Sequence, residues 1–236
     1  NIMDQSWNGS APRYPGGKIL VVSLPGVQIG SEVEYEVKVK NTKQPLLSTI
    51  VMFQNGSPII NKEVSVRYPE KLDVNISASS GKFSSSIKKQ KGFITKTWES
   101  GNIGAIAPEM RTPPKWFFAP RLEISIGNWK AYSANLKKQL EKAANKQPKT
   151  EKLALELTSG KETEKAMLAI RDYVARKIRA AGPGLNGLPS EYISNADTTL
   201  EAAYGNSSDR AVLIYTMLKK AGFKPEFIAV ASVTPV

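Results

Sequence analysis

The sequence contains neither cysteine nor histidine. Without cysteine, the chain can form no disulfide framework, offers no thiolate to a zinc ion and has no thiol nucleophile. Without histidine, it lacks the side chain that most often acts as a general base or a metal ligand. A cysteine–histidine catalytic pair is therefore excluded within this chain, and we expect no metal site and no cofactor.

Long apolar runs are also missing. The longest near-continuous one, Ile19–Leu24, is interrupted by Ser23 and has the length of a strand, whereas a membrane-spanning helix needs about 20 apolar residues. We therefore expect no transmembrane segment. The sequence starts at Asn1 without a charged and then apolar leader, and such a leader can be removed from a mature protein, so this absence is uninformative.

Basic residues are plentiful. The chain has 33 Lys and Arg against 21 Asp and Glu, which gives a net charge of +12. Such an excess suits nucleic acid when it forms a stripe on one face. Here it is spread over both halves of the chain, and its densest cluster, Lys88–Lys91, has the pattern of a turn. We therefore interpret the lysines as a solvated surface and expect no nucleic-acid partner.

The first half of the chain has the pattern of strands. Residues 31–40 (SEVEYEVKVK) alternate strictly between apolar and charged side chains, which predicts a half-buried antiparallel strand. Many short runs of this kind, separated by turn residues, favour a β-sandwich. Further strands are predicted at residues 19–23, 48–54, 59–67, 73–77, 82–88, 93–99 and 121–125.

A proline-rich connector, Gly104–Pro120, follows these strands. Its aromatic run Trp116-Phe117-Phe118 either anchors the connector in the core or forms an exposed ligand platform, and we favour the core because aromatic residues usually bury. Trp98 and Trp129 are likewise interpreted as packing residues. Trp7 and Tyr14 stand in a Gly/Pro-rich start where a stacking site lacks support.

The second half turns helical. Apolar residues three or four apart predict one helix from Trp129 to Leu140 and another over Thr163–Arg179, capped by Thr158 or Ser159. A polar break covers Lys146–Thr150. A third helix starts near Ser207–Asp209 and ends at Ala221-Gly222, and the apolar run Phe227–Ser232 reads as a buried strand.

The start of the third helix carries a motif of alternating residues, Gly205, Ser207, Asp209 and Ala211. Ala196–Val230 resembles the nucleophile region of the transglutaminase-like superfamily, which has a papain-like fold and a cysteine where this chain has Ser207. The resemblance makes Ser207 the nucleophile position, with Tyr204, Gly205, Asn206 and Asp209 supporting it. Capping offers a simpler role for the same residues, because Asn and Ser cap helices well and Asp suits the first turn.

The first half adds a second resemblance. Leu24–Val27, Trp98–Pro113 and Trp129 resemble a β-rich domain of unknown function that commonly precedes transglutaminase-like domains in bacterial secreted or periplasmic proteins. We therefore predict an α+β chain. Its antiparallel β-sandwich would span residues 1–125, and residues 126–236 would form the helical first part of a transglutaminase-like domain. The location implied is periplasmic or extracellular.

In that family the cysteine acts with a histidine base and an orienting Asp or Asn. A serine hydroxyl is far less acidic than a thiol, so it needs a base in direct contact. The leading hypothesis is a catalytically degenerate envelope protein that binds or scaffolds a protein, peptide or glycan. Two alternatives stay open: an active cysteine protease or transglutaminase seen as a fragment or Cys-to-Ser variant, and a structural spacer. A homodimer is one way to cover apolar surface near Phe227–Val236.

Overall fold

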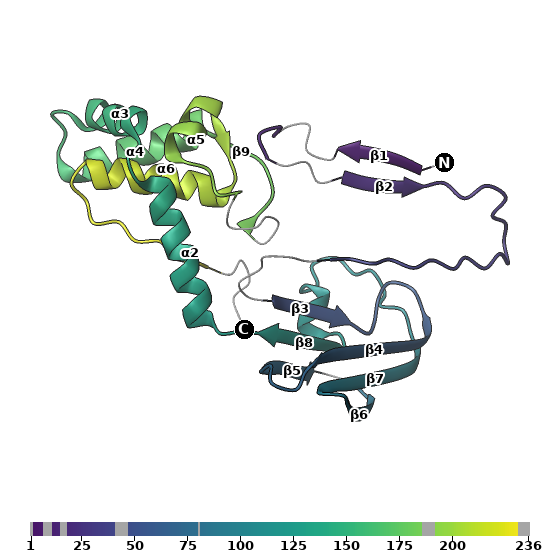
Figure 1. The fold of residues 1–236 in the computed structure, drawn as a ribbon. Coiled ribbons are helices and arrows are strands. Elements are labelled where there is room, and N and C mark those ends of the chain that lie inside the picture. The colour runs from purple at the N-terminus through teal and green to yellow at the C-terminus, as the bar shows by residue number, and fades with distance from the viewer. Residues whose placement is uncertain are drawn as a thin grey trace. The chain divides into compact units, whose positions relative to one another are not determined.

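A computed structural model describes residues 2–6, 11–14, 18–40, 47–79, 81–185 and 192–230. The chain has an α+β fold in which antiparallel sheets precede a helical segment (Figure 1), as the sequence predicts. Its contacts divide it into two compact units. We call residues 44–133 the sandwich unit, and residues 1–43 with 134–236 the helical unit. The domain boundary at residue 125 stays a prediction.

The sandwich unit holds two three-stranded antiparallel sheets and the single-turn helix α1, Lys115–Phe118. The strand orders are β3-β8-β5 and β4-β7-β6. The strands are β3 Leu47–Met52, β4 Ile59–Pro69, β5 Val74–Ser79, β6 Ser84–Gln90, β7 Phe93–Ile103 and β8 Arg121–Ile126.

The core of the sandwich unit draws on both sheets. Trp98 of β7 packs in one cluster with Phe53 and with Leu122 and Ile124 of β8. Successive side chains along a strand point to opposite faces of the sheet, so only every second residue of a strand can reach this cluster. Val64 and Val66 of β4 and Val74 and Ile76 of β5 pack against it. The predicted sandwich and the packing role of Trp98 are both confirmed.

Among its described residues, the helical unit contains an antiparallel strand pair, most of α2, the helices α3 to α6 and a small parallel strand pair. Its core lies between helices, where Ile170, Val174, Leu213 and Met217 are fully buried. The elements are β1 Ile2–Ser6, β2 Lys18–Val22, α2 Trp129–Ala144, α3 Pro148–Thr158, α4 Thr163–Lys177, β9 Arg179–Ala180, α5 Ala196–Ala202, β10 Tyr204–Gly205 and α6 Ser207–Lys220.

Three predicted helices are confirmed as α2, α4 and α6, and Gly222 takes the left-handed conformation after α6, with φ +90°. The predicted break at Lys146–Thr150 is confirmed, but with different bounds, because α2 ends at Ala144 and α3 already starts at Pro148. The cap predicted for α4 is wrong: Thr158 is the last residue of α3, and Glu162 stands at the N-cap of α4.

The helices α3 and α5 exchange caps, which explains why their starts carry little local signal. Asp197 of α5 accepts the backbone N–H groups of Lys149 and Thr150, at 3.2 and 2.8 Å. In return, the Gln147 side chain accepts the N–H of Asp197 at 3.0 Å. Each helix start is therefore satisfied by a side chain about 50 residues away in sequence rather than by a local cap.

Two predicted strands are not formed. Residues 31–40 have no secondary structure and are exposed throughout, and Phe227–Val230 has none either, while 231 and 232 lie outside the described residues. A strand needs a neighbour for its N–H and C=O groups, and neither segment has a ladder partner in the part of the chain that the structure describes. Phe227 instead stacks on Tyr215 of α6, with ring centroids 4.2 Å apart.

The aromatic residues around β8 are more exposed than predicted. Trp116, Phe117 and Phe118 are 39–42% exposed, and Trp129 is 73% exposed. Burial in the core was therefore the wrong prediction for these four side chains. The single turn α1 has no buried residue, and Phe53 and Trp98 already fill the adjoining core. Trp7 lies outside the described residues.

No helix among the described residues is both long and apolar enough to cross a membrane.

Candidate functional site

The turn that leads into α6 carries the predicted motif. Tyr204 and Gly205 form β10, Asn206 is the N-cap of α6, and Ser207 is the first residue of the helix. The Ser207 side chain is exposed to solvent at the positive end of the helix dipole. It makes no hydrogen bond to any residue that the structure describes. The structure thus presents a solvent-exposed hydroxyl at the position where the resemblance expects a nucleophile.

Asn206 caps the helix. Its side-chain oxygen accepts the backbone N–H of Asp209 at 2.9 Å, which is the standard N-cap geometry. Asn206 is itself buried, and its own backbone N–H donates to the Tyr14 hydroxyl at 2.5 Å. The capping role predicted for this turn is therefore confirmed for Asn206.

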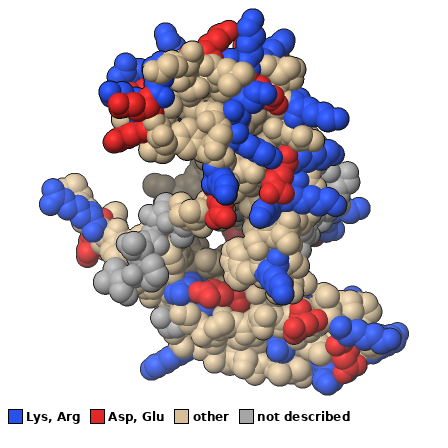
Figure 2. All heavy atoms as spheres, turned by 90° about the vertical axis from the view of Figure 1, so that its left-hand side faces the viewer, with Lys and Arg blue, Asp and Glu red and all other residues tan. Residues whose placement is uncertain are grey.

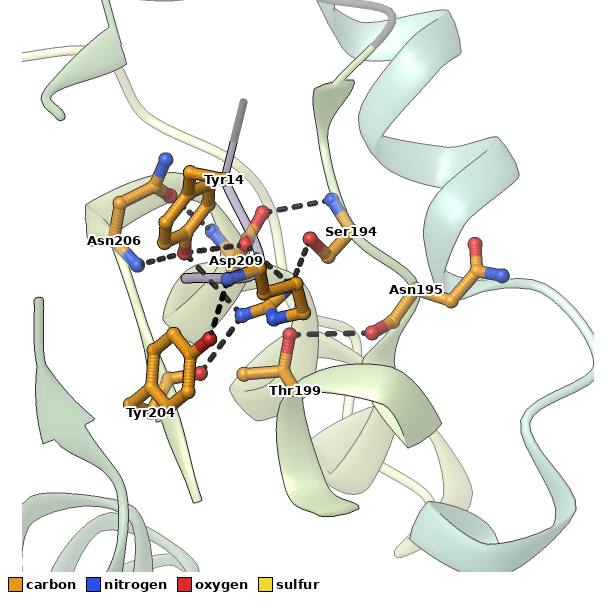
Figure 3. A network of polar contacts seen from close by, with 8 residues as sticks. Tyr14, Ser194, Asn195, Thr199, Tyr204, Asn206 and Asp209 are labelled. Carbon is orange, nitrogen blue, oxygen red and sulfur yellow. Dashed lines mark hydrogen bonds and ion pairs between the residues drawn. The ribbon is translucent and has the colours of Figure 1, made fainter. Parts of the chain in front are cut away.

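Asp209 is the buried centre of the site, and its side chain is 0% exposed. Its Oδ1 atom accepts the backbone N–H of Ser194 at 2.8 Å, and its Oδ2 atom accepts the Tyr14 hydroxyl at 2.7 Å. The Arg13 guanidinium lies 3.2 Å from the same Oδ2. Figure 3 shows these contacts converging on the carboxylate. A carboxylate held this fully by donors is suited to ordering the turn rather than to transferring protons.

Tyr14 is 3% exposed and bridges the two halves of the turn, because its hydroxyl donates to Asp209 and accepts from Asn206. Burial raises the pKa of the Tyr14 phenol above its ordinary value of about 10, and the bond to the Asp209 carboxylate raises the pKa further. Ionisation would place a second negative charge beside Asp209 in a site closed to water. The phenol therefore stays protonated at neutral pH.

Arg13 ties the N-terminal segment to the same turn. Its guanidinium donates to the Tyr204 carbonyl at 2.8 Å and to the Ser194 hydroxyl, besides contacting Asp209. Its backbone N–H donates to the Tyr204 hydroxyl at 2.8 Å. The guanidinium also lies over the Tyr14 and Tyr204 rings, 4.8 and 5.1 Å from their centroids. Such contacts fix both aromatic rings and the backbone of β10.

Two glycines make room for this arrangement. A Cβ atom on Gly205 would come within 2.9 Å of Thr199 Cγ2 and 3.1 Å of Asp209 Cβ. Gly182 has φ +97°, and a Cβ atom there would lie 2.3 Å from the Tyr14 ring. Gly205 of the motif is therefore required by space, and Gly182 by both its backbone conformation and its contact with Tyr14.

Sequence reasoning placed Tyr204, Gly205, Asn206, Ser207 and Asp209 together, and the structure shows them as one turn. It missed the partners that hold the turn, which are Arg13 and Ser194, and it gave Tyr14 no role. These residues lie up to 196 positions from Asp209 and carry no local pattern. The Gly/Pro-rich stretch around Tyr14 marked a turn but not what it contacts.

No cluster of three or more acidic side chains that could hold a metal ion occurs within the described ranges. A separate cavity of about 750 Å³ lies between α2, α3 and α6 and does not include the Ser207 turn. Five lysines line it, at positions 138, 142, 146, 219 and 220. On the face shown in Figure 2, basic and acidic side chains are interspersed. The absence of a nucleic-acid partner stays a prediction.

Comparison with known proteins adds two findings. A family described as a domain of unknown function with a solved structure, DUF3857, matches residues 1–107. This confirms a domain of unknown function in the first half of the chain. No curated protein matches.

The crystal structure of a candidate protease from Parabacteroides distasonis is similar in fold, with a TM-score of 0.66 and 24% sequence identity. The match covers 78% of this chain and 36% of that one. This chain therefore spans about a third of the length of that protein, and at this identity the likeness establishes the fold alone.

Proposed function

We propose that the chain is a transglutaminase-like module in which Ser207 holds the nucleophile position, and that it binds or scaffolds a ligand instead of catalysing a reaction. The observation that carries the proposal is the turn itself. Ser207 is exposed at a helix N-terminus, where this family places its cysteine, and the supporting residues hold that turn in place. The fold shared with a candidate protease supports the module type and not the loss of catalysis.

The case against catalysis is energetic. A helix dipole stabilises a nearby negative charge by about 0.3–1 kcal/mol, far less than ionisation of a serine hydroxyl at neutral pH requires. A serine nucleophile therefore needs a base in hydrogen-bond contact. Asp209, the nearest carboxylate along the chain, already accepts hydrogen bonds from Tyr14 and Ser194 and pairs with Arg13. These facts favour a stable turn over an active centre.

The proposal is tested by measuring amide hydrolysis and amine incorporation with a casein substrate. We expect no turnover above buffer for the chain with Ser207, and the same result for Ser207→Ala. Turnover that Ser207→Ala abolishes would instead establish the enzyme alternative. The measurement should be repeated on any longer form of the protein, because this chain matches only 36% of the related structure.

A Ser207→Cys variant tests whether the turn has the electrostatics of a nucleophile site. A thiol at a helix N-terminus has a pKa below the ordinary value of about 8.5. We therefore expect the pH profile of alkylation by iodoacetamide to shift to lower pH than for Ser84→Cys, which places a thiol on the exposed strand β6. Identical profiles for the two thiols would contradict the assignment of Ser207 to the nucleophile position.

The resemblance also supports a periplasmic or extracellular location, which fractionation of cells that express the native gene would test.

A further inference from the structure

The sandwich unit has a cavity of about 510 Å³ over its β3-β8-β5 sheet. Leu122 and Ile124 of β8 are buried in the core, so Glu123 and Ser125, which alternate with them, face the other side of the sheet. Both line the cavity. The cavity therefore lies on the outer face of this sheet, within the usual size range of ligand pockets, which is roughly 300–1,000 Å³.

The floor of the cavity is a row of short polar side chains. Ser125 lies opposite Ser48 of β3 on one side and opposite Asn75 of β5 on the other, and directly opposed residues of antiparallel strands point to the same face. All three line the cavity, as do Glu123 in the next row and the apolar Ile50 opposite it. Hydroxyl and amide groups thus cross all three strands side by side, next to one carboxylate and one isoleucine.

Two tryptophans border this floor. Trp116 comes from α1, before β8, and Trp129 from the first residue of α2, after β8, and both line the cavity. They are 39% and 73% exposed. Edge-to-face contacts orient them: Trp116 on Phe117 with centroids 6.1 Å apart, and Trp129 on Tyr132 at 5.7 Å. Both indole side chains are therefore accessible to solvent beside the polar row.

The charge of the cavity differs from that of the chain. Although the chain carries 33 Lys and Arg, none of those that the structure describes lines this cavity. The charged residue in the described lining, Glu123, is paired with Arg121 at 2.7 Å. Among the described residues, a phosphate or carboxylate ligand would therefore find no unpaired cation in the lining to offset its loss of water. The lining thus selects a ligand that is uncharged.

We infer that this groove binds a neutral oligosaccharide. A sugar ring has an apolar C–H face that packs on an indole ring and a rim of hydroxyls that bond to Ser, Asn and Glu. An apolar peptide side chain would pack on the tryptophans but would cover the polar side chains of the floor without giving them hydrogen-bond partners in place of water, which is costly. The inference rests on the proposed binding role and names its ligand class, at a site that shares no residue with the Ser207 turn.

The test is a titration of the full chain with cellotriose, maltotriose and chitotriose, in which binding is measured by tryptophan fluorescence and by calorimetry. We expect saturable binding of at least one trisaccharide, with an affinity that changes little with salt. Trp129→Ala and Trp116→Ala should each weaken that binding about tenfold, as truncation of a buried aromatic anchor does. Asn75→Ala should weaken it without changing the thermal midpoint, because Asn75 is exposed in the free protein.

Ile60→Ala is the matched control, since Ile60 is an 86% exposed apolar residue on the other sheet of the same unit. Its affinity for the trisaccharide should equal that of the unchanged chain. No binding of any trisaccharide up to millimolar concentration would overturn the inference. So would binding that both tryptophan variants leave intact, or tighter binding of an apolar peptide at the same tryptophans. The turnover assays on Ser207 test the proposed loss of catalysis, and the trisaccharide titrations test the groove. Failure of one proposal is therefore distinguishable from failure of the other.

Discussion

At the residue scale, the site depends on Tyr14 more than on any residue of the motif itself. Its hydroxyl is bonded at once to the Asp209 carboxylate and to the backbone N–H of the cap residue Asn206. Both partners are buried. Removing the hydroxyl would leave a buried N–H and a carboxylate lone pair without a partner, and each such loss costs about 1–3 kcal/mol.

Tyr14→Phe should therefore lower the free energy of unfolding by about 2–6 kcal/mol at neutral pH, because two buried groups lose their partner. The pKa of Tyr14 is raised in the folded state, so the stability linked to its proton is fully present below the unfolded pKa of about 10 and is lost as the pH rises above it. The gap between the unchanged chain and Tyr14→Phe should shrink accordingly. Urea unfolding of both proteins from pH 8 to about pH 11 measures it.

Tyr35→Phe serves as the control for this pH series, because Tyr35 is 83% exposed. Its unfolding free energy should match that of the unchanged chain at every pH below 10. A gap between the unchanged chain and Tyr14→Phe that stays constant through the alkaline range would show that Tyr14 ionises as readily folded as unfolded.

At the element scale, residues 31–40 illustrate the difference between a strand pattern and a strand. Val33, Tyr35, Val37 and Val39 alternate perfectly with charged residues, yet all four are 47–83% exposed. Alternation shows which face would be buried against a sheet. It does not supply the neighbouring strand, and among the described residues none pairs with this segment.

Hydrogen exchange tests this element. Backbone amides of residues 32–40 have no described hydrogen-bond acceptor, so they should exchange at nearly the rate of an open chain. Strand β7 is paired on both sides, by β4 and β6, and should be strongly protected. Protection of residues 32–40 that depends on protein concentration would instead reveal pairing with a second copy. Light scattering would then test the homodimer, which stays a prediction.

At the scale of the whole molecule, the two compact units have separate cores. Phe53, Trp98, Leu122 and Ile124 fill that of the sandwich unit. Helices α3 to α6 form the other, around residues such as Leu213. A chain with two cores need not unfold in one cooperative step.

Leu122→Ala should lower the stability of the sandwich unit by about 2–5 kcal/mol, because Leu122 is fully buried. Calorimetry should then show one transition moving to lower temperature while the other stays in place. Leu213→Ala, which removes an equally buried leucine from the helical unit, should move the second transition instead. If both substitutions shift a single transition together, the two cores unfold as one cooperative unit.

Local chemistry in the sequence was enough to predict α2, α4 and α6, the sandwich and a capping turn among residues 206–209. Apolar periodicity and capping preferences act between residues a few positions apart, so they can be read without coordinates. The sequence pattern also placed Ser207 at a helix start, although the function of that serine stays a proposal.

Only the tertiary structure decided what those elements contact. Arg13 and Tyr14 clamp a turn more than 190 positions away, and α3 and α5 cap each other across about 50. The tryptophans that flank β8 gather over polar residues from three strands. Such contacts depend on which segments meet in space, and a one-dimensional pattern records each segment's preference without its partner.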